Sequence, residues 1–123
     1  MNRIWIATGA ISALICVAVG AFGAHALQLT ERWADIYDTG VQYQMFHTIG
    51  MLIVGLAGDR LARPGAARWA GRLFVAGIVL FSGSLYALSV TETTWLGAIT
   101  PLGGLAFLAG WALLAVAALA KRQ

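Results

Sequence analysis

The sequence predicts an all-α integral membrane protein, an up-down four-helix bundle with both termini in the cytoplasm. Hydrophobic residues make up 60% of its 123 residues and charged residues only 11%, whereas soluble domains average about 45–50% and about 25%. Four apolar stretches each approach the roughly 20 residues that a helix needs to cross a bilayer. The positively charged residues gather on one side of these stretches, as in membrane proteins. Eight basic and five acidic side chains are too few to cover a water-soluble fold of this length.

The predicted spans cover about residues 4–27, 41–61, 73–90 and 99–120, and together they form a single transmembrane domain over residues 1–123. Charged clusters separate them, and no stretch remains for a soluble domain. The first span resembles a signal peptide, because a basic residue precedes it and Ala24-His25-Ala26, near its end, resembles a cleavage site of small residues. Its apolar run is longer than that of a typical signal peptide, so we expect it to be retained as a helix.

The orientation follows from the distribution of Lys and Arg, which favours the cytoplasmic side. With four spans, the two termini and the connection between the second and third spans share one side. That side carries seven basic residues: Arg3, Arg60, Arg63, Arg68, Arg72, Lys121 and Arg122. The opposite side carries only Arg32, next to acidic residues. The sequence therefore predicts that both termini are cytoplasmic.

Several residues mark the ends of the predicted helices. Pro64 cannot continue a helix, so residues 63–65 are expected to form a turn after the second span. Thr100 and Pro101 are expected to be the N-cap and first residue of the fourth span. Between the first two spans, residues 33–40 place apolar side chains at helical spacing. We expect an amphipathic turn there, either separate from the second span or continuous with it.

Glycine is abundant, with 15 residues, most of them inside the spans. Small residues let helix backbones approach closely within a membrane. We therefore predict that glycines spaced by about one helical turn mark the packed faces of the bundle. The predicted helix-packing residues are Gly20, Gly23, Gly55, Gly103 and Gly110. The alternative is that the same seams line a path for a ligand.

Polar residues inside the spans are costly in hydrocarbon and are often functional. The candidate ligand-binding residues are His25, Gln44, His47, Ser82, Ser84 and Tyr86. Burial disfavours the charged form of histidine, so we expect a neutral His47 that faces the interior and bonds a neighbouring helix. Its expected partners are Ser82, Ser84 or Tyr86, or residues 20–25. A purely structural role for both histidines is the alternative to a binding role.

The sequence offers no pattern typical of an enzyme, a metal site or a cofactor site. Cys16 is the only cysteine, and His25 and His47 have no obvious third metal ligand. The acidic residues all lie in loops or at span ends, so the spans contain no acidic side chain that could act as the base for a buried nucleophile. We therefore expect no enzymatic activity, no cofactor and no metal. The basic residues flank apolar stretches, so the expected partners are membrane lipid, a second copy or another membrane protein, and not nucleic acid.

Four ordered segments carry a resemblance to a known family. These segments are residues 20–27 (GAFGAHAL), 41–47 (VQYQMFH), 80–86 (LFSGSLY) and 97–104 (GAITPLGG). They resemble the small bacterial inner-membrane proteins catalogued as domain of unknown function 423. The resemblance covers nearly the whole chain and implies a four-helix inner-membrane protein. It implies no activity, because that family has none assigned.

Two classes of function remain open at this point. The first is a structural or accessory membrane subunit that packs through its glycine-rich faces. The second is a small-molecule, lipid or proton-linked binding or transport protein, with a polar pocket in the outer leaflet around His25 and His47. A cavity shared by the six candidate residues would favour the second class. Tight packing among them would favour the first.

Overall fold

The computed structural model describes residues 1–121, which form four long helical rods joined by short connections. The first two are α1 (Arg3–His25) and α2 (Glu31–Ala57), followed by the 3-10 turn η1 (Gly58–Arg60). The third rod is continuous and consists of α3 (Pro64–Gly77), the π-helical segment η2 (Ile78–Ser82) and α4 (Gly83–Thr91). A 3-10 segment, η3 (Thr94–Ala98), leads into the last rod, α5 (Thr100–Leu119).

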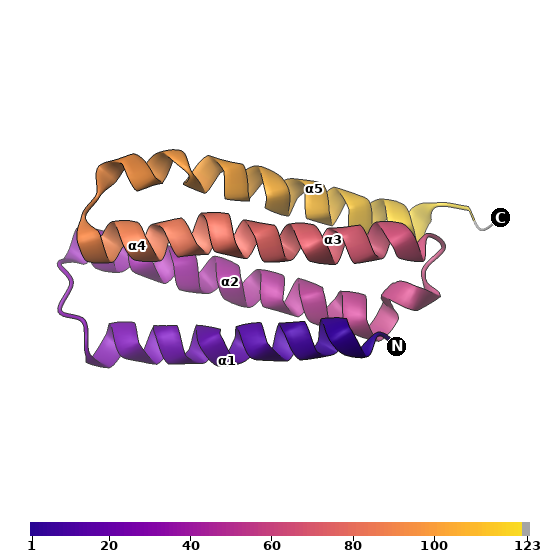
Figure 1. The fold of residues 1–123 in the computed structure, drawn as a ribbon, viewed down its shortest axis with the longest axis horizontal. Helices are drawn as coiled ribbons and strands as arrows, with labels where there is room; N and C mark the ends of the chain where they lie inside the picture. The colour runs from indigo at the N-terminus through magenta and orange to yellow at the C-terminus, as the bar shows by residue number, and fades with distance from the viewer. Residues whose placement is uncertain (122–123) are drawn as a thin grey trace.

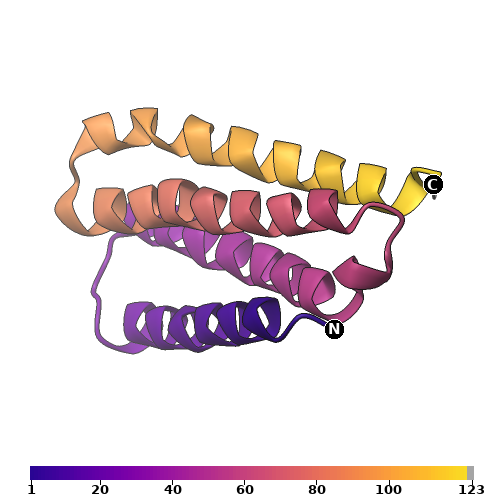
Figure 2. The same cartoon turned by 45° about the vertical axis from the view of Figure 1, so that its right-hand side comes forward.

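The rods lie side by side in chain order, with α1 and α5 at opposite edges (Figure 1, Figure 2). The main helix pairs are α1 with α2 and α3 with α5. Both ends of the chain lie at the same end of the molecule as the connection between α2 and α3 (Figure 1). There, the Asn2 amide donates to the Gly55 carbonyl at 2.7 Å and the Arg63 amide to the Ala117 carbonyl at 3.1 Å. The rods therefore alternate in direction along the chain.

Three stretches of the described residues are long and apolar enough to cross a membrane, judged by length and composition. They are Arg3–His25, Pro64–Thr91 and Thr94–Leu119. The sequence predicts a fourth span within α2, which is absent from this set. The reason is that α2 is the most polar rod: it begins in a charged segment and buries Gln44, His47 and Thr48.

The helix boundaries correct several expectations. The amphipathic turn over residues 33–40 is continuous with the second span, because α2 already begins at Glu31. The predicted turn at residues 63–65 is wrong, since Pro64 opens α3. Proline suits a first helical turn because its missing N–H would have no partner there. Thr100 is likewise not an N-cap but the first residue of α5, preceded by Ile99.

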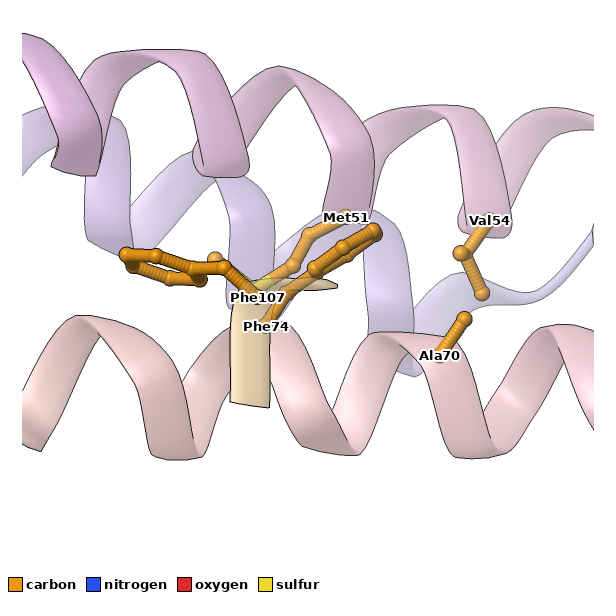
Figure 3. Packing of buried hydrophobic residues seen from close by; sticks show 5 residues of the cluster. All are labelled: Met51, Val54, Ala70, Phe74 and Phe107. Atoms are coloured by element: carbon orange, nitrogen blue, oxygen red, sulfur yellow. The ribbon is translucent and has the colours of Figure 1, made fainter. Parts of the chain in front are cut away.

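The apolar core lies where α2, α3 and α5 meet. Met51 and Val54 from α2, Ala70 and Phe74 from α3, and Phe107 from α5 form one buried cluster (Figure 3). The Phe74 ring is fully buried between two glycine-containing helices. A Cβ atom would lie 2.8 Å from this ring if added at Gly50, and 2.7 Å if added at Gly110. Glycine at these two positions therefore makes room for the ring.

The other predicted packing glycines differ in how closely their neighbours approach. A Cβ at Gly55 would lie 2.8 Å from the backbone nitrogen of Ile6, and one at Gly103 would collide with the Phe81 backbone. A Cβ at Gly23 would collide with the Tyr37 ring. At Gly20 the nearest atom, in Val41, would be 3.6 Å away, which is ordinary contact. Gly20 therefore lies at a helix contact that does not require glycine.

Replacing Gly55 with leucine is expected to lower the free energy of unfolding by about 1–3 kcal/mol, the usual cost of overpacking. The added side chain meets α1 backbone atoms, but α1 is an edge helix and can move outward. Thermal melting in detergent measures the change. The matched control is Leu56→Ile, because the Leu56 side chain is exposed on the same helix. Equal melting temperatures for wild type and Gly55→Leu would show that α1 does not pack here.

Candidate functional site

The six predicted ligand-binding residues do not form one site. Gln44 and Tyr86 pair between α2 and α4, whereas Ser82 and Ser84 bond to two different neighbouring helices. His47 faces α5. His25, in the last turn of α1, is exposed. The expected pocket shared by His25 and His47 is therefore absent from the described residues.

Gln44 is the centre of a chain of hydrogen bonds that links three helices. The Tyr86 hydroxyl donates to Oε1 of Gln44 at 2.7 Å. The Gln44 amide donates to the Ser12 carbonyl at 3.2 Å and lies 3.4 Å from the Ser12 hydroxyl. That hydroxyl is 2.6 Å from Oγ1 of Thr48. Ser12 and Thr48 were absent from the predicted set, because a hydroxyl residue on an apolar helix gives no signal of its partner.

Ser82 and Ser84 lie at the junction of η2 and α4, where the third rod contacts both neighbours. The Ser82 hydroxyl donates to the Gly40 carbonyl of α2 at 2.7 Å. The Ser84 hydroxyl donates to the Phe81 carbonyl at 2.9 Å and lies 2.6 Å from Oγ1 of Thr100 in α5. Interhelical bonds of this kind hold membrane helices together. Both serines therefore link helices, and the Thr100 hydroxyl serves this contact instead of capping α5.

His47 is 3% exposed and bonds to α5, but through a residue outside the expected partners. The Trp111 indole donates to Nε2 of His47 at 2.9 Å. Because an indole only donates and a carbonyl only accepts, Nε2 is unprotonated and Nδ1 donates to the Tyr43 carbonyl at 2.7 Å. The imidazole is thus neutral, and it stacks on Phe107 with ring centroids 3.5 Å apart. The expected partners are wrong because position 47 faces α5, where the mid-span Trp111 reaches it.

A groove of about 850 Å³ opens between α2 and α5, and we call it the aromatic groove. Its volume falls within the roughly 300–1,000 Å³ typical of small-molecule sites. Its lining consists mostly of rings: Gln42, Tyr43, Phe46, His47, Phe81, Pro101, Gly104, Leu105, Phe107, Leu108 and Trp111. Among residues 1–121, neither the Gln42 amide nor the Tyr43 hydroxyl has a hydrogen-bond partner, and both residues are exposed.

Two smaller grooves flank α1. One of about 400 Å³ runs between α1 and the third rod, with Gln44 and Tyr86 in its lining. The other, of about 330 Å³, runs between α1 and α2 and includes Cys16. His25, Ser82 and Ser84 line none of these three grooves. The candidate residues thus fall into separate environments, and His47 alone of the six lines the aromatic groove.

The described residues contain no group of three or more His, Cys, Asp or Glu side chains that could hold a metal ion. Both ring nitrogens of His47 are bonded to protein groups. The buried Cys16 thiol lies 3.5 Å from the Val41 carbonyl. Every buried side-chain nitrogen and oxygen in the described part of the chain has a hydrogen-bond partner.

Comparison with known proteins places this arrangement in a family. A family profile described as "Protein of unknown function (DUF423)" matches residues 19–104. The chain is 50% identical over 118 residues to the UPF0382 membrane protein YwdK of Bacillus subtilis, covering 94% of this chain and 96% of that one. It is 43% identical to a UPF0382 membrane protein of Staphylococcus epidermidis (95% and 96% covered) and 42% identical to one of Haemophilus influenzae (94% and 93%). No solved structure matches. Since the profile covers more than half of the chain and the relatives align along nearly all of it, the chain belongs to the DUF423 family of membrane proteins.

Proposed function

We propose that this protein is a non-enzymatic accessory subunit of the bacterial inner membrane that packs against another membrane protein or a second copy. The observation that carries the proposal is the pairing of the buried polar groups within residues 1–121. The polar side chains that could otherwise bind a ligand, such as Gln44, His47 and Ser82, form hydrogen bonds that hold the helices together. What the protein offers to other molecules is therefore its helix surfaces.

The open row of helices supports this proposal. Because α1 and α5 lie at opposite edges (Figure 2), each leaves a long face that no other helix of the chain covers. Small residues on these faces allow another helix backbone to approach closely. Exposed alanines occur along both helices: Ala7, Ala10, Ala18 and Ala21 on α1, and Ala109, Ala112, Ala115 and Ala118 on α5. Lateral association through the edge helices follows from this arrangement.

Site-specific photocrosslinking in cells tests the proposal. A photoreactive residue at Val17 of α1 or Val116 of α5, both exposed, is expected to give a crosslink to protein from at least one of these edges. The matched control is Val79 in the third rod, which is 65% exposed but lies between the edges. It is expected to crosslink to lipid only. Lipid crosslinks alone at all three positions would contradict an accessory role.

We further propose that both termini are cytoplasmic. Arg3 opens α1, Arg60 and Arg63 lie between α2 and α3, and Arg68 and Arg72 lie in the first half of α3. The start of α1 and the connection between α2 and α3 lie at the end of the molecule where the chain begins and ends (Figure 1). Arg68 pairs with Asp59 at 3.3 Å, and the Arg72 guanidinium lies 4.7 Å from the Trp69 ring centre, both on the exposed surface. Arg122 lies outside the described residues. An excess of arginine on one side is the usual signal for the cytoplasmic face.

Reporter fusions check this orientation. A reporter fused after Gln123 is expected to give a cytoplasmic signal, and one inserted after Glu92 an external signal. Glu92 is exposed in the connection between α4 and α5, where an insertion does not interrupt a helix. A cytoplasmic signal from the Glu92 insertion would overturn the proposed topology.

A further inference from the structure

We propose that the aromatic groove binds an uncharged amphiphile whose flat ring carries carbonyl or hydroxyl oxygens, that is, a quinone-type membrane lipid. This inference goes beyond the accessory role and does not depend on it. It rests on the length of the groove, the rings that line it, its lack of charge and two polar groups that have no partner among the described residues.

The groove has the length and position of a site within one leaflet. Along α5 its lining runs from Pro101 to Trp111, which is about 15 Å at 1.5 Å per residue. That is half of a hydrocarbon core of about 30 Å. Pro101 lies at the start of α5, and Gln42 lies four residues after the charged Asp38 of α2. The groove therefore runs from the membrane interface toward the middle of the bilayer, as an amphiphile does.

The walls of the groove favour a flat ring over a plain acyl chain. The centroid of the Tyr43 ring lies 4.5 Å from that of Phe81, and the centroid of Phe46 lies 5.2 Å from that of Trp111. Phe81 and Phe107 are 5.5 Å apart by the same measure. Aromatic rings stack with centroids about 4.5–7 Å apart. A further ring entering this cluster meets aromatic faces from α2, η2 and α5.

The polarity of the groove specifies the head of the ligand. No Lys, Arg, Asp or Glu lines it, so a phosphate or ammonium head would lack a compensating charge. The Gln42 amide and the Tyr43 hydroxyl lack partners within the described chain and can donate to a carbonyl oxygen. Both nitrogens of His47 are already bonded and its ring is almost fully covered, so the imidazole offers the ligand neither a donor nor an acceptor. An uncharged ring with carbonyl oxygens matches these groups.

Quenching of tryptophan fluorescence by decylubiquinone, with the protein in lipid nanodiscs, tests this proposal. A quinone that binds beside Trp111 is expected to quench the fluorescence of wild type saturably. Gly104→Leu is expected to abolish the saturable quenching, because the nearest atom to a Cβ there is 4.0 Å away and the added side chain fills the groove. Ala109→Leu is the matched control, since Ala109 is exposed on the same helix outside the groove. It is expected to bind like wild type.

Two further measurements separate the possible occupants. Tyr43→Phe keeps the ring but removes the hydroxyl, so the affinity for the quinone is expected to fall roughly threefold to tenfold. Dioleoylglycerol, an uncharged amphiphile without a flat ring, is expected not to compete. If it competes as well as the quinone, the groove holds acyl chains and the proposal is wrong. The proposal is equally wrong if the Gly104→Leu variant folds as wild type does and retains saturable quenching. It is also wrong if neither wild type nor Gly104→Leu binds the quinone while native mass spectrometry shows a dimer for wild type that Gly104→Leu loses. In that case a second copy occupies the groove.

Discussion

Replacing Gly103 with leucine is expected to unfold the protein in detergent, whereas the same change at the neighbouring Gly104 leaves it folded. Gly103 is buried against η2, and a Cβ there would collide with the backbone nitrogen of Phe81. Backbone atoms within a continuous helix cannot move aside as a flexible side chain can. The expected loss of unfolding free energy is therefore at or above about 3 kcal/mol, the upper end of typical overpacking costs.

Gly104 is the matched position because it has the same helix, the same residue type and a different environment. A Cβ there is 4.0 Å from its nearest neighbour, in the Phe81 side chain. Leucine is also favoured over glycine in a helix by up to about 1 kcal/mol. Thermal melting of both variants measures the difference. If Gly103→Leu melts within a degree or two of Gly104→Leu, α5 does not contact the π-helical segment as described.

The second large effect is expected for His47→Ala, which removes the only described partner of the Trp111 indole. The indole is part-buried, and leaving its donor unpaired between membrane-spanning helices costs about 1–3 kcal/mol. The substitution also removes the ring that stacks on Phe107, so the loss of packing adds to this cost. We expect a clear fall in the thermal melting temperature. His47→Gln retains an acceptor for the indole and is expected to recover much of the stability, although not the stacking.

A double-mutant cycle with Trp111→Phe isolates the bond between the two side chains. Removing both partners leaves neither group unpaired, so the double variant is expected to lose less stability than the sum of the single variants. Additive losses would show that His47 and Trp111 act independently. A His47→Gln variant that is as stable as wild type but loses a bound ligand would instead assign a binding role to His47.

Much of the fold could be predicted from hydropathy, because the bilayer sets the length of an apolar helix and Lys and Arg mark its ends. The beginnings of helices were less predictable. Glu31 opens α2 although half of residues 31–38 are charged, since an amphipathic segment continues the helix outside the apolar region. Proline is compatible with both a turn and a first helical residue, so Pro64 alone could not decide between them.

The hydrogen-bond partners could not be predicted, for a different reason. Periodicity places a residue on a face of its own helix but gives no information about which helix lies opposite. Gln44 and Tyr86 were both predicted to be ligand-binding residues, yet only the fold brings the Tyr86 hydroxyl within 2.7 Å of the Gln44 amide oxygen. His47 is the sharper case, because its partner Trp111 lies 64 positions away in the sequence. The aromatic groove is invisible in the sequence for the same reason, since it is assembled from α2, η2 and α5.

The measurement that tests the accessory role most directly is native mass spectrometry of the protein extracted gently from its own membrane. The account predicts a complex of fixed stoichiometry with a second membrane protein or a second copy. It also predicts that leucine at Ala112, on the exposed face of α5, or at Ala18, on the exposed face of α1, weakens this complex without lowering the melting temperature. A single chain carrying only lipid, in wild type and variants alike, would contradict it.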